Sequence, residues 1–208
     1  MHGDGITAAT RAHVESIYLR TLDHLEAVFS TRAYLLGERP TLADFGFFAS
    51  MFRHCALDPT PGALMREHAP HTFEWVARLW NARASRTHGP LADGIPGDWS
   101  PILREVGDAY LPHLCANAAA WKARARRFDV TIQGTSYRGL FVSRYRVWCL
   151  EELRRHFEAL SNDARRAARE LLEEHGCWEP LWRVEAPASG YDVAGAAPFA
   201  RGLPMFGG

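Results

Sequence analysis

The sequence lacks most of the features that mark special classes of protein. Its 208 residues contain only four cysteines and no CxxC pair, so neither a disulfide framework nor a zinc ribbon is indicated. No apolar run approaches the ~18 residues of a membrane span, and no charged segment precedes an apolar leader. The GxGxxG and GK[ST] motifs that hold nucleotide phosphates are also missing. These absences predict an intracellular, cytoplasmic chain with free thiols and no membrane contact.

An excess of charge of one sign is missing as well. The chain has 24 Lys or Arg against 24 Asp or Glu, so its net charge does not point to nucleic acid. The distribution is uneven, because residues 122–169 carry twelve basic against five acidic residues and residues 170–208 carry two against six. With 47% hydrophobic and 23% charged residues, the composition is that of one ordinary globular domain, or one domain with a small appendage.

Hydrophobic periodicity predicts a chain that is nearly all helix. Apolar residues three to four positions apart predict a long helix from Ile6 to about Arg32. A proline in the first turn favours a helix from Pro70 and another from Ser100 to about Arg127, which Pro112 should kink. Further helices are expected over residues 62–68, 147–160 and 161–176. No βαβ pattern occurs, so the predicted fold class is all-α.

One segment departs from the helical pattern. Residues 128–133 alternate apolar and polar, residues 134–136 read as a turn, and residues 137–142 form a second candidate strand. A lone hairpin is marginal, so this one, about 128–142, must pack on neighbouring helices. The predicted organisation is a helical domain over 1–84, a Gly- and Pro-rich loop over 85–99, additional helices with the hairpin over 100–186, and an irregular tail over 187–208.

The strongest local signal is a helix start at Thr41. Thr41 can cap the first amides of a helix, and Asp44, three residues later, can reach back to the amide of Thr41. The helix that follows, Phe45 to Phe52, is apolar nearly all round. We therefore predict a structural capping box and a buried central helix.

The segment from Tyr34 to Phe45, which reads YLLGERPTLADF, resembles the entry to the central helix of the C-terminal domain of glutathione transferases. In that family an LxGxxP[ST]xAD stretch supplies the capping box. The long helix before it and the helix from Pro70 fit the same domain, so the resemblance covers about residues 6–84. It implies a helical bundle of the glutathione-transferase C-terminal type, followed here by an additional helical segment with a small β-hairpin.

The resemblance also implies a function. In the family, this helical half binds an apolar electrophile, which an activated glutathione thiolate attacks; glutathione is thus a co-substrate by resemblance only. The residue that activates the thiol belongs to a thioredoxin-like N-terminal domain, which we expect to lie outside this chain, so the catalytic residue stays unknown and the isolated chain is expected to be inactive. The implied hydrophobic pocket is lined by the first helix and the end of the central helix, with these substrate-binding residues: His13, Ile17, Tyr18, Met51, Phe52, Arg53 and His54.

Two other functions remain open. One is a non-catalytic protein-interaction module of the glutathione-transferase type, with a possible homodimer. The other is a single-stranded nucleic-acid binder that uses the arginines and aromatic residues of 121–148. The acidic stretch 170–185 favours a different role for these arginines, as a solvated face that forms ion pairs with that stretch. Nucleic-acid binding is therefore the weakest of the three hypotheses.

A metal site is not predicted. Pro70 separates His68 from His71, so the two cannot share one unbroken helix. The His–Cys pairs at 113/115 and 175/177 are spaced too closely for tetrahedral ligands.

Overall fold

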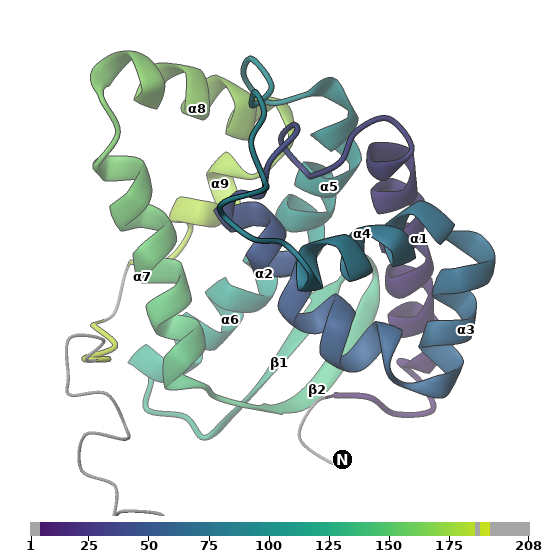
Figure 1. Cartoon of the computed structure of the whole chain (residues 1–208). Coiled ribbons are helices and arrows are strands. Elements are labelled where there is room, and N and C mark those ends of the chain that lie inside the picture. The colour runs from purple at the N-terminus through teal and green to yellow at the C-terminus, as the bar shows by residue number, and fades with distance from the viewer. Residues whose placement is uncertain (1–4, 186–187, 192–208) are drawn as a thin grey trace, which may run out of the picture.

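A computed structural model describes residues 5–185 and 188–191 of the chain. Over these residues the fold is mostly helical, with one two-stranded antiparallel sheet, which confirms the predicted fold class. Helices α1 to α4 gather on one side of the molecule, α7 and α8 on the other, and α6 runs between them above the hairpin (Figure 1). Of the predicted tail, only residues 188–191 are among the described residues.

The elements follow one another along the chain with these bounds: α1 (Arg11–Phe29), α2 (Leu42–Ser50), the π-helix η1 (Met51–Ala56), α3 (Pro59–His68), α4 (Pro70–Trp80), the 3₁₀-helix η2 (Gly97–Trp99), α5 (Ser100–Glu105), the π-helix η3 (Val106–Tyr110), α6 (Leu111–Lys122), β1 (Arg127–Ile132), β2 (Thr135–Phe141), α7 (Arg144–Glu158), α8 (Asn162–Glu174) and α9 (Trp178–Trp182).

The first core lies between α1 and α4. Leu22, Leu25 and Val28 recur at helical spacing on α1 and are fully buried. Trp75 of α4 stacks on this face, with its ring centroid 4.6 Å from that of Phe29. The predicted boundary at residue 84 does not limit this core, because Trp99 and Ile102, which follow the loop, pack into it.

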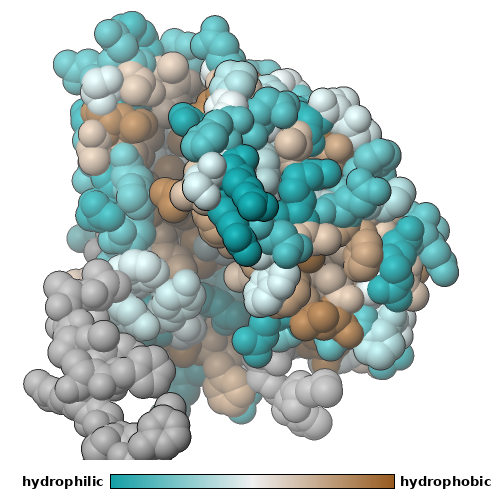
Figure 2. All heavy atoms as spheres, viewed as in Figure 1, coloured by the Kyte–Doolittle hydropathy of each residue, from teal (hydrophilic) through white to brown (hydrophobic). Residues whose placement is uncertain are grey.

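A second core joins the remaining helices. Leu111 and Leu114 of α6 pack against Leu150 of α7 and Leu181 of α9. On the face shown in Figure 2, hydrophilic residues predominate, and hydrophobic side chains gather in the recess between α7 and the bundle of α1 to α4.

The hairpin packs on helices, as predicted. Its buried residues contact alanines of η3 and α6 and Val14 of α1; they are Phe128, Ile132, Tyr137 and Leu140. The turn, however, is Gln133–Gly134 and not 134–136, with φ angles of 48° and 80°. Two successive left-handed residues give the turn whose twist matches that of the two strands.

The helix predicted from Ser100 to about Arg127 is corrected in two places. It is not one regular helix, because α5, the π-helix η3 and α6 follow one another, and Pro112 lies in the first turn of α6. The π-helix η3 directly precedes that turn, so the chain stays helical from Ser100 to Lys122 but changes its hydrogen-bonding pattern between Val106 and Tyr110. The helix then ends at Lys122, and Arg124 takes a left-handed φ of 55° that turns the chain toward β1.

The predicted burial of the central helix is also wrong in part. In α2 and η1, Asp44 and Met51 are buried, but Leu42 is 88% exposed and Phe45 is 55% exposed. The cause is the packing: among the described residues α2 lies mainly against α4 and η1, so its other face stays uncovered.

Gly107 permits a close approach that we expect to matter for stability. A Cβ at this position of η3 would lie 2.9 Å from the carbonyl oxygen of His175 and 3.0 Å from the backbone of Gly176. Because backbone atoms move less easily than a side-chain tip, Gly107→Ala should lower the free energy of unfolding by about 1–3 kcal/mol. Urea unfolding of this variant and of Gly97→Ala, where the added Cβ has no neighbour within 4 Å, checks the prediction; equal losses would contradict it.

No helix in the described part of the chain is long and apolar enough to cross a membrane. The same residues contain no group of three His, Cys, Asp or Glu side chains that could hold a metal ion.

Candidate functional site

A cavity of about 350 Å³ lies where α1, α2, the run from α5 to α6, and β1 meet. Most of its wall is apolar, with a few polar groups among the aliphatic and aromatic side chains, as is typical of small-molecule sites. The residues that line it are Ile17, Thr21, His24, Phe47, Ile102, Glu105, Val106, Ala109, Tyr110, His113 and Ile132.

Helical spacing explains why these side chains face one another. On α1 the lining residues lie three or four positions apart and therefore share one face. From Ile102 to His113 the same spacing continues through η3, which contributes Val106, Ala109 and Tyr110. π-helical turns are rare and frequently occur at functional sites.

Two polar groups of the wall are uncharged at neutral pH. Burial, assisted by the charge of Arg146, lowers the pKa of His113 to about 4, so its imidazole is neutral at pH 7. Its Nε2 is buried with no hydrogen-bond partner, and its ring packs at 72° to that of Phe128. Burial and the neighbouring Cys149 thiol raise the pKa of Tyr110 to about 12, so its phenol stays protonated.

A polar network ties the turn of the hairpin to the helices beside the cavity. The Tyr137 hydroxyl lies 2.7 Å from Nδ1 of His13, and Nε2 of His13 lies 3.0 Å from Oε1 of Gln133. The Gln133 amide nitrogen in turn donates to Glu105 at 3.2 Å, and Arg20 donates to both Gln133 and Glu105. Because an amide oxygen can only accept, Nε2 of His13 carries a hydrogen. The turn is thus held in place by hydrogen bonds from both α1 and α5.

Only part of the predicted substrate-binding set meets this cavity. Ile17 lines it, and His13 lies in the network beside it. The Tyr18 hydroxyl donates instead to the carbonyl of Pro61 at 2.9 Å. Met51 is 6% exposed and belongs to the first core.

The other three predicted residues lie away from the cavity. Phe52 stacks on Trp80, with ring centroids 4.5 Å apart, and Arg53 and His54 are exposed on η1. The end of the central helix therefore contributes no lining residue, because it packs toward α3 and α4. Phe47, four residues before Met51 in the chain, lines the cavity instead.

The polar groups of the wall were missed in the sequence. Glu105, Tyr110 and His113 lie outside the segment that resembles the transferase domain. Their spacing of three or four residues from Ile102 predicts that they share one face of a helix. The spacing does not predict which other helix this face packs against.

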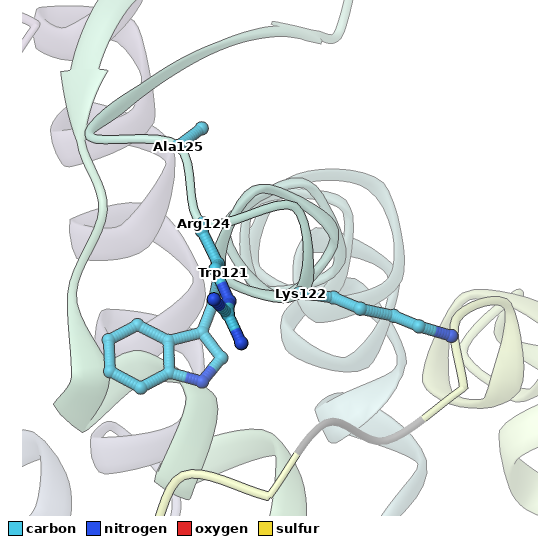
Figure 3. A pocket seen from close by; sticks show the side chains of 4 residues that line it. All are labelled: Trp121, Lys122, Arg124 and Ala125. Carbon is cyan, nitrogen blue, oxygen red and sulfur yellow. The ribbon is translucent and has the colours of Figure 1, made fainter.

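A second hollow, of about 410 Å³, lies at the end of α6 and is lined by Trp121, Lys122, Arg124 and Ala125 (Figure 3). Lys122 points away from the Trp121 ring and pairs with Glu185. The indole nitrogen of Trp121 donates to the carbonyl of Ala188 at 3.4 Å. Two of its four side chains thus hold the chain's own C-terminal segment, so we place the candidate site in the apolar cavity.

The expected pairing of the arginine-rich segment with residues 170–185 is largely wrong. Among the described residues, Lys122–Glu185 is the one salt bridge that joins the two segments. The other ion pairs of the acidic stretch are local, at a spacing of four residues: Arg169–Glu173 and Glu179–Arg183. Arg127 and Arg144 instead donate to the backbone carbonyls of Gly139 and Ser189.

Comparison with known proteins found a similar family for the first part of the chain. The family model described as glutathione S-transferase, C-terminal domain, matches residues 3–82, which is close to the predicted 6–84. Searches of the curated proteins and of the solved structures found no match. The matched segment contains α1 to α4, whereas α5, η3, α6 and β1 of the cavity wall lie beyond it. Residues 3–82, fewer than half of the 208 residues, are therefore similar to the C-terminal domain of glutathione S-transferases.

Proposed function

We propose that this chain is the helical, ligand-binding half of a glutathione-transferase-like protein and that the apolar cavity holds the ligand. The observation that carries the proposal is a cavity of about 350 Å³ that opens on the first helix of the family-matched segment. Burial of apolar ligand surface in such a site is favourable by about 25 cal/mol per Å². In the chemistry of the family, the ligand would be an apolar electrophile.

The additional C-terminal segment completes this site. Ile17 and Phe47 come from the matched segment, whereas Ile102, Val106 and Ile132 come from the residues after it. The hairpin and η3 thus act as a wall of the cavity, which gives the segment after residue 99 a role in ligand binding.

Glutathione itself does not fit this cavity. Among the described residues that line it there is no Lys or Arg, and Glu105 is an acidic side chain. Glutathione carries two carboxylates, which need positive or hydrogen-bonding partners when they leave water. We therefore assign the cavity to an apolar ligand and derive no thiol-activation step from it.

Filling the cavity should abolish ligand binding. Ala109 lines the cavity from η3, and Ala109→Phe adds a ring to that wall. Benzofuran, a compact apolar aromatic ligand, should bind the parent chain and bind this variant at least about tenfold more weakly, since the lost burial exceeds about 1.4 kcal/mol. Ligand-observed NMR titration measures both affinities.

The matched control is Ala119→Phe, which adds the same ring at an exposed position of α6. It should leave the affinity unchanged, and urea unfolding should show that both variants are folded. Equal binding by the parent chain and Ala109→Phe would show that the ligand lies elsewhere.

A second candidate is a protein-interaction module. It is favoured by large exposed apolar side chains of the matched segment, among them Leu42, Phe45 and Trp80, of which Trp80 is 63% exposed. Apolar residues that gather on a surface often mark an interaction site. Failure of the parent chain to bind compact aromatic ligands, both with and without a hydrogen-bond donor, would favour this candidate over the first.

A further inference from the structure

We propose that the ligand of the cavity carries a hydrogen-bond donor, an N–H or O–H group on a compact apolar frame, and that Glu105 accepts it. This inference rests on the proposed function and specifies the class of its ligand. It assigns Glu105 as the residue that determines specificity.

The carboxylate of Glu105 has unused capacity to accept hydrogen bonds. Arg20 Nη2 lies 3.3 Å and 3.4 Å from its two oxygens, and the Gln133 amide nitrogen lies 3.2 Å from Oε1. All three contacts are longer than the usual 2.9–3.0 Å. A carboxylate offers about four lone-pair positions, so a further donor can be accommodated at shorter distance.

The neighbouring cation does not line the cavity. Arg20 is absent from the lining residues, and it donates to Ser16 at 3.0 Å and to Gln133 at 2.8 Å as well as to Glu105. A ligand in the cavity therefore meets Glu105 and not Arg20.

One hydroxyl donor of the wall is already engaged within the protein, because Thr21 donates its hydroxyl to the carbonyl of Ile17 at 2.8 Å. An acceptor on the ligand therefore finds Thr21 occupied, although Tyr110, His24 and His113 also line the wall. A donor on the ligand finds the carboxylate of Glu105, whose existing contacts are long.

Ligand discrimination follows from the cost of covering a charged group. A hydrogen bond to an ionised acceptor is stronger than a neutral one, and a ligand without a donor removes water from the carboxylate and gives nothing in return. Because Glu105 is partly shielded, with 21% of its side chain exposed, this difference should be measurable.

Indole and benzofuran test the proposal, because they have the same shape and differ in an N–H group against an oxygen atom. The parent chain should bind indole at least about tenfold more tightly than benzofuran, as expected for a hydrogen bond to a charged group. Glu105→Gln should reduce this ratio to below about threefold, because indole loses its hydrogen bond to a charged group and benzofuran no longer covers a carboxylate. Ligand-observed NMR titration gives all four affinities.

The control variant is Glu15→Gln, which removes the same charge from an exposed position of α1; its ratio should equal that of the parent. A ratio near one in the parent chain, with Ala109→Phe still weakening both ligands, would overturn this inference and leave the proposed function in place. A ratio that survives in Glu105→Gln would overturn the assignment to Glu105. Failure of the parent chain to bind either ligand would overturn both proposals.

Discussion

Replacement of Asp44 by alanine should lower the free energy of unfolding by about 3–5 kcal/mol, because it removes a buried charged group from several partners at once. Asp44 is fully buried. Its Oδ1 accepts from the backbone amide of Leu35 at 2.9 Å and from the indole nitrogen of Trp75 at 3.1 Å. Its Oδ2 accepts from the amide and the hydroxyl of Thr41 at 2.8 Å and 2.9 Å.

These four hydrogen bonds join three parts of the first core. Leu35 belongs to the loop after α1, Thr41 precedes α2, and Trp75 is the central side chain of α4. Alanine would leave buried donors of Leu35 and Trp75 without an acceptor, each at a cost of about 1–3 kcal/mol. The expected loss is therefore larger than that of a helix cap alone.

Two comparison variants separate these contributions. Thr41→Ala removes one hydroxyl of the capping box and should cost about 0.5–2 kcal/mol. Asp23→Ala removes a carboxylate from an exposed position of α1 and should change stability by less than about 0.5 kcal/mol. Urea unfolding of the three variants measures the series. A loss below about 1 kcal/mol for Asp44→Ala would contradict the prediction.

The example of Asp44 shows how far the sequence alone could lead. The spacing of Thr41 and Asp44 predicts the capping box, because both partners lie within one helical turn. The structure contains this capping box. The bonds of Asp44 to Leu35 and Trp75 could not be predicted from that spacing, since they depend on how α4 packs against the loop.

The irregular helix between Ser100 and Lys122 shows a second limit. Pro112 correctly signals an irregularity, because it removes an N–H from the helix. The π-helix η3 lies just before Pro112, and its Gly107 lies against the backbone of His175 and Gly176. The sequence spacing does not predict this distant contact.

The candidate site was predictable only where a resemblance reached it. Ile17 lies on the first helix of the family-matched segment and lines the cavity. Glu105 and His113 lie beyond residue 82, and the contact of their helix with α1 depends on the return of the chain through residues 81–99. No local sequence pattern predicts the path of the chain through residues 81–99.

The second large loss of stability is expected on replacement of Arg154, a residue of α7 that donates hydrogen bonds to the end of α9. Arg154 is 6% exposed. Its Nε and Nη2 donate to the carbonyl of Leu181 at 2.9 Å and 2.7 Å, and Nη2 also donates to the carbonyl of Val184 at 2.8 Å. The guanidinium carbon lies 5.2 Å from the centre of the Trp182 ring. One side chain thus satisfies the carbonyls at the C-terminal end of α9, where a cation is favourable.

Arg154→Ala should therefore lower the free energy of unfolding by about 2–4 kcal/mol, from the lost charged hydrogen bonds and the gap beside Trp182. Arg154→Lys should restore less than half of the loss, because a single ammonium group cannot reproduce the planar fork. The control is the neighbouring Arg155→Ala, which breaks a surface pair with Glu152 and should cost less than about 1 kcal/mol. Urea unfolding followed by circular dichroism measures the stability of the three variants. Equal stability of the two alanine variants would mean that α9 is held by its apolar contacts and not by Arg154.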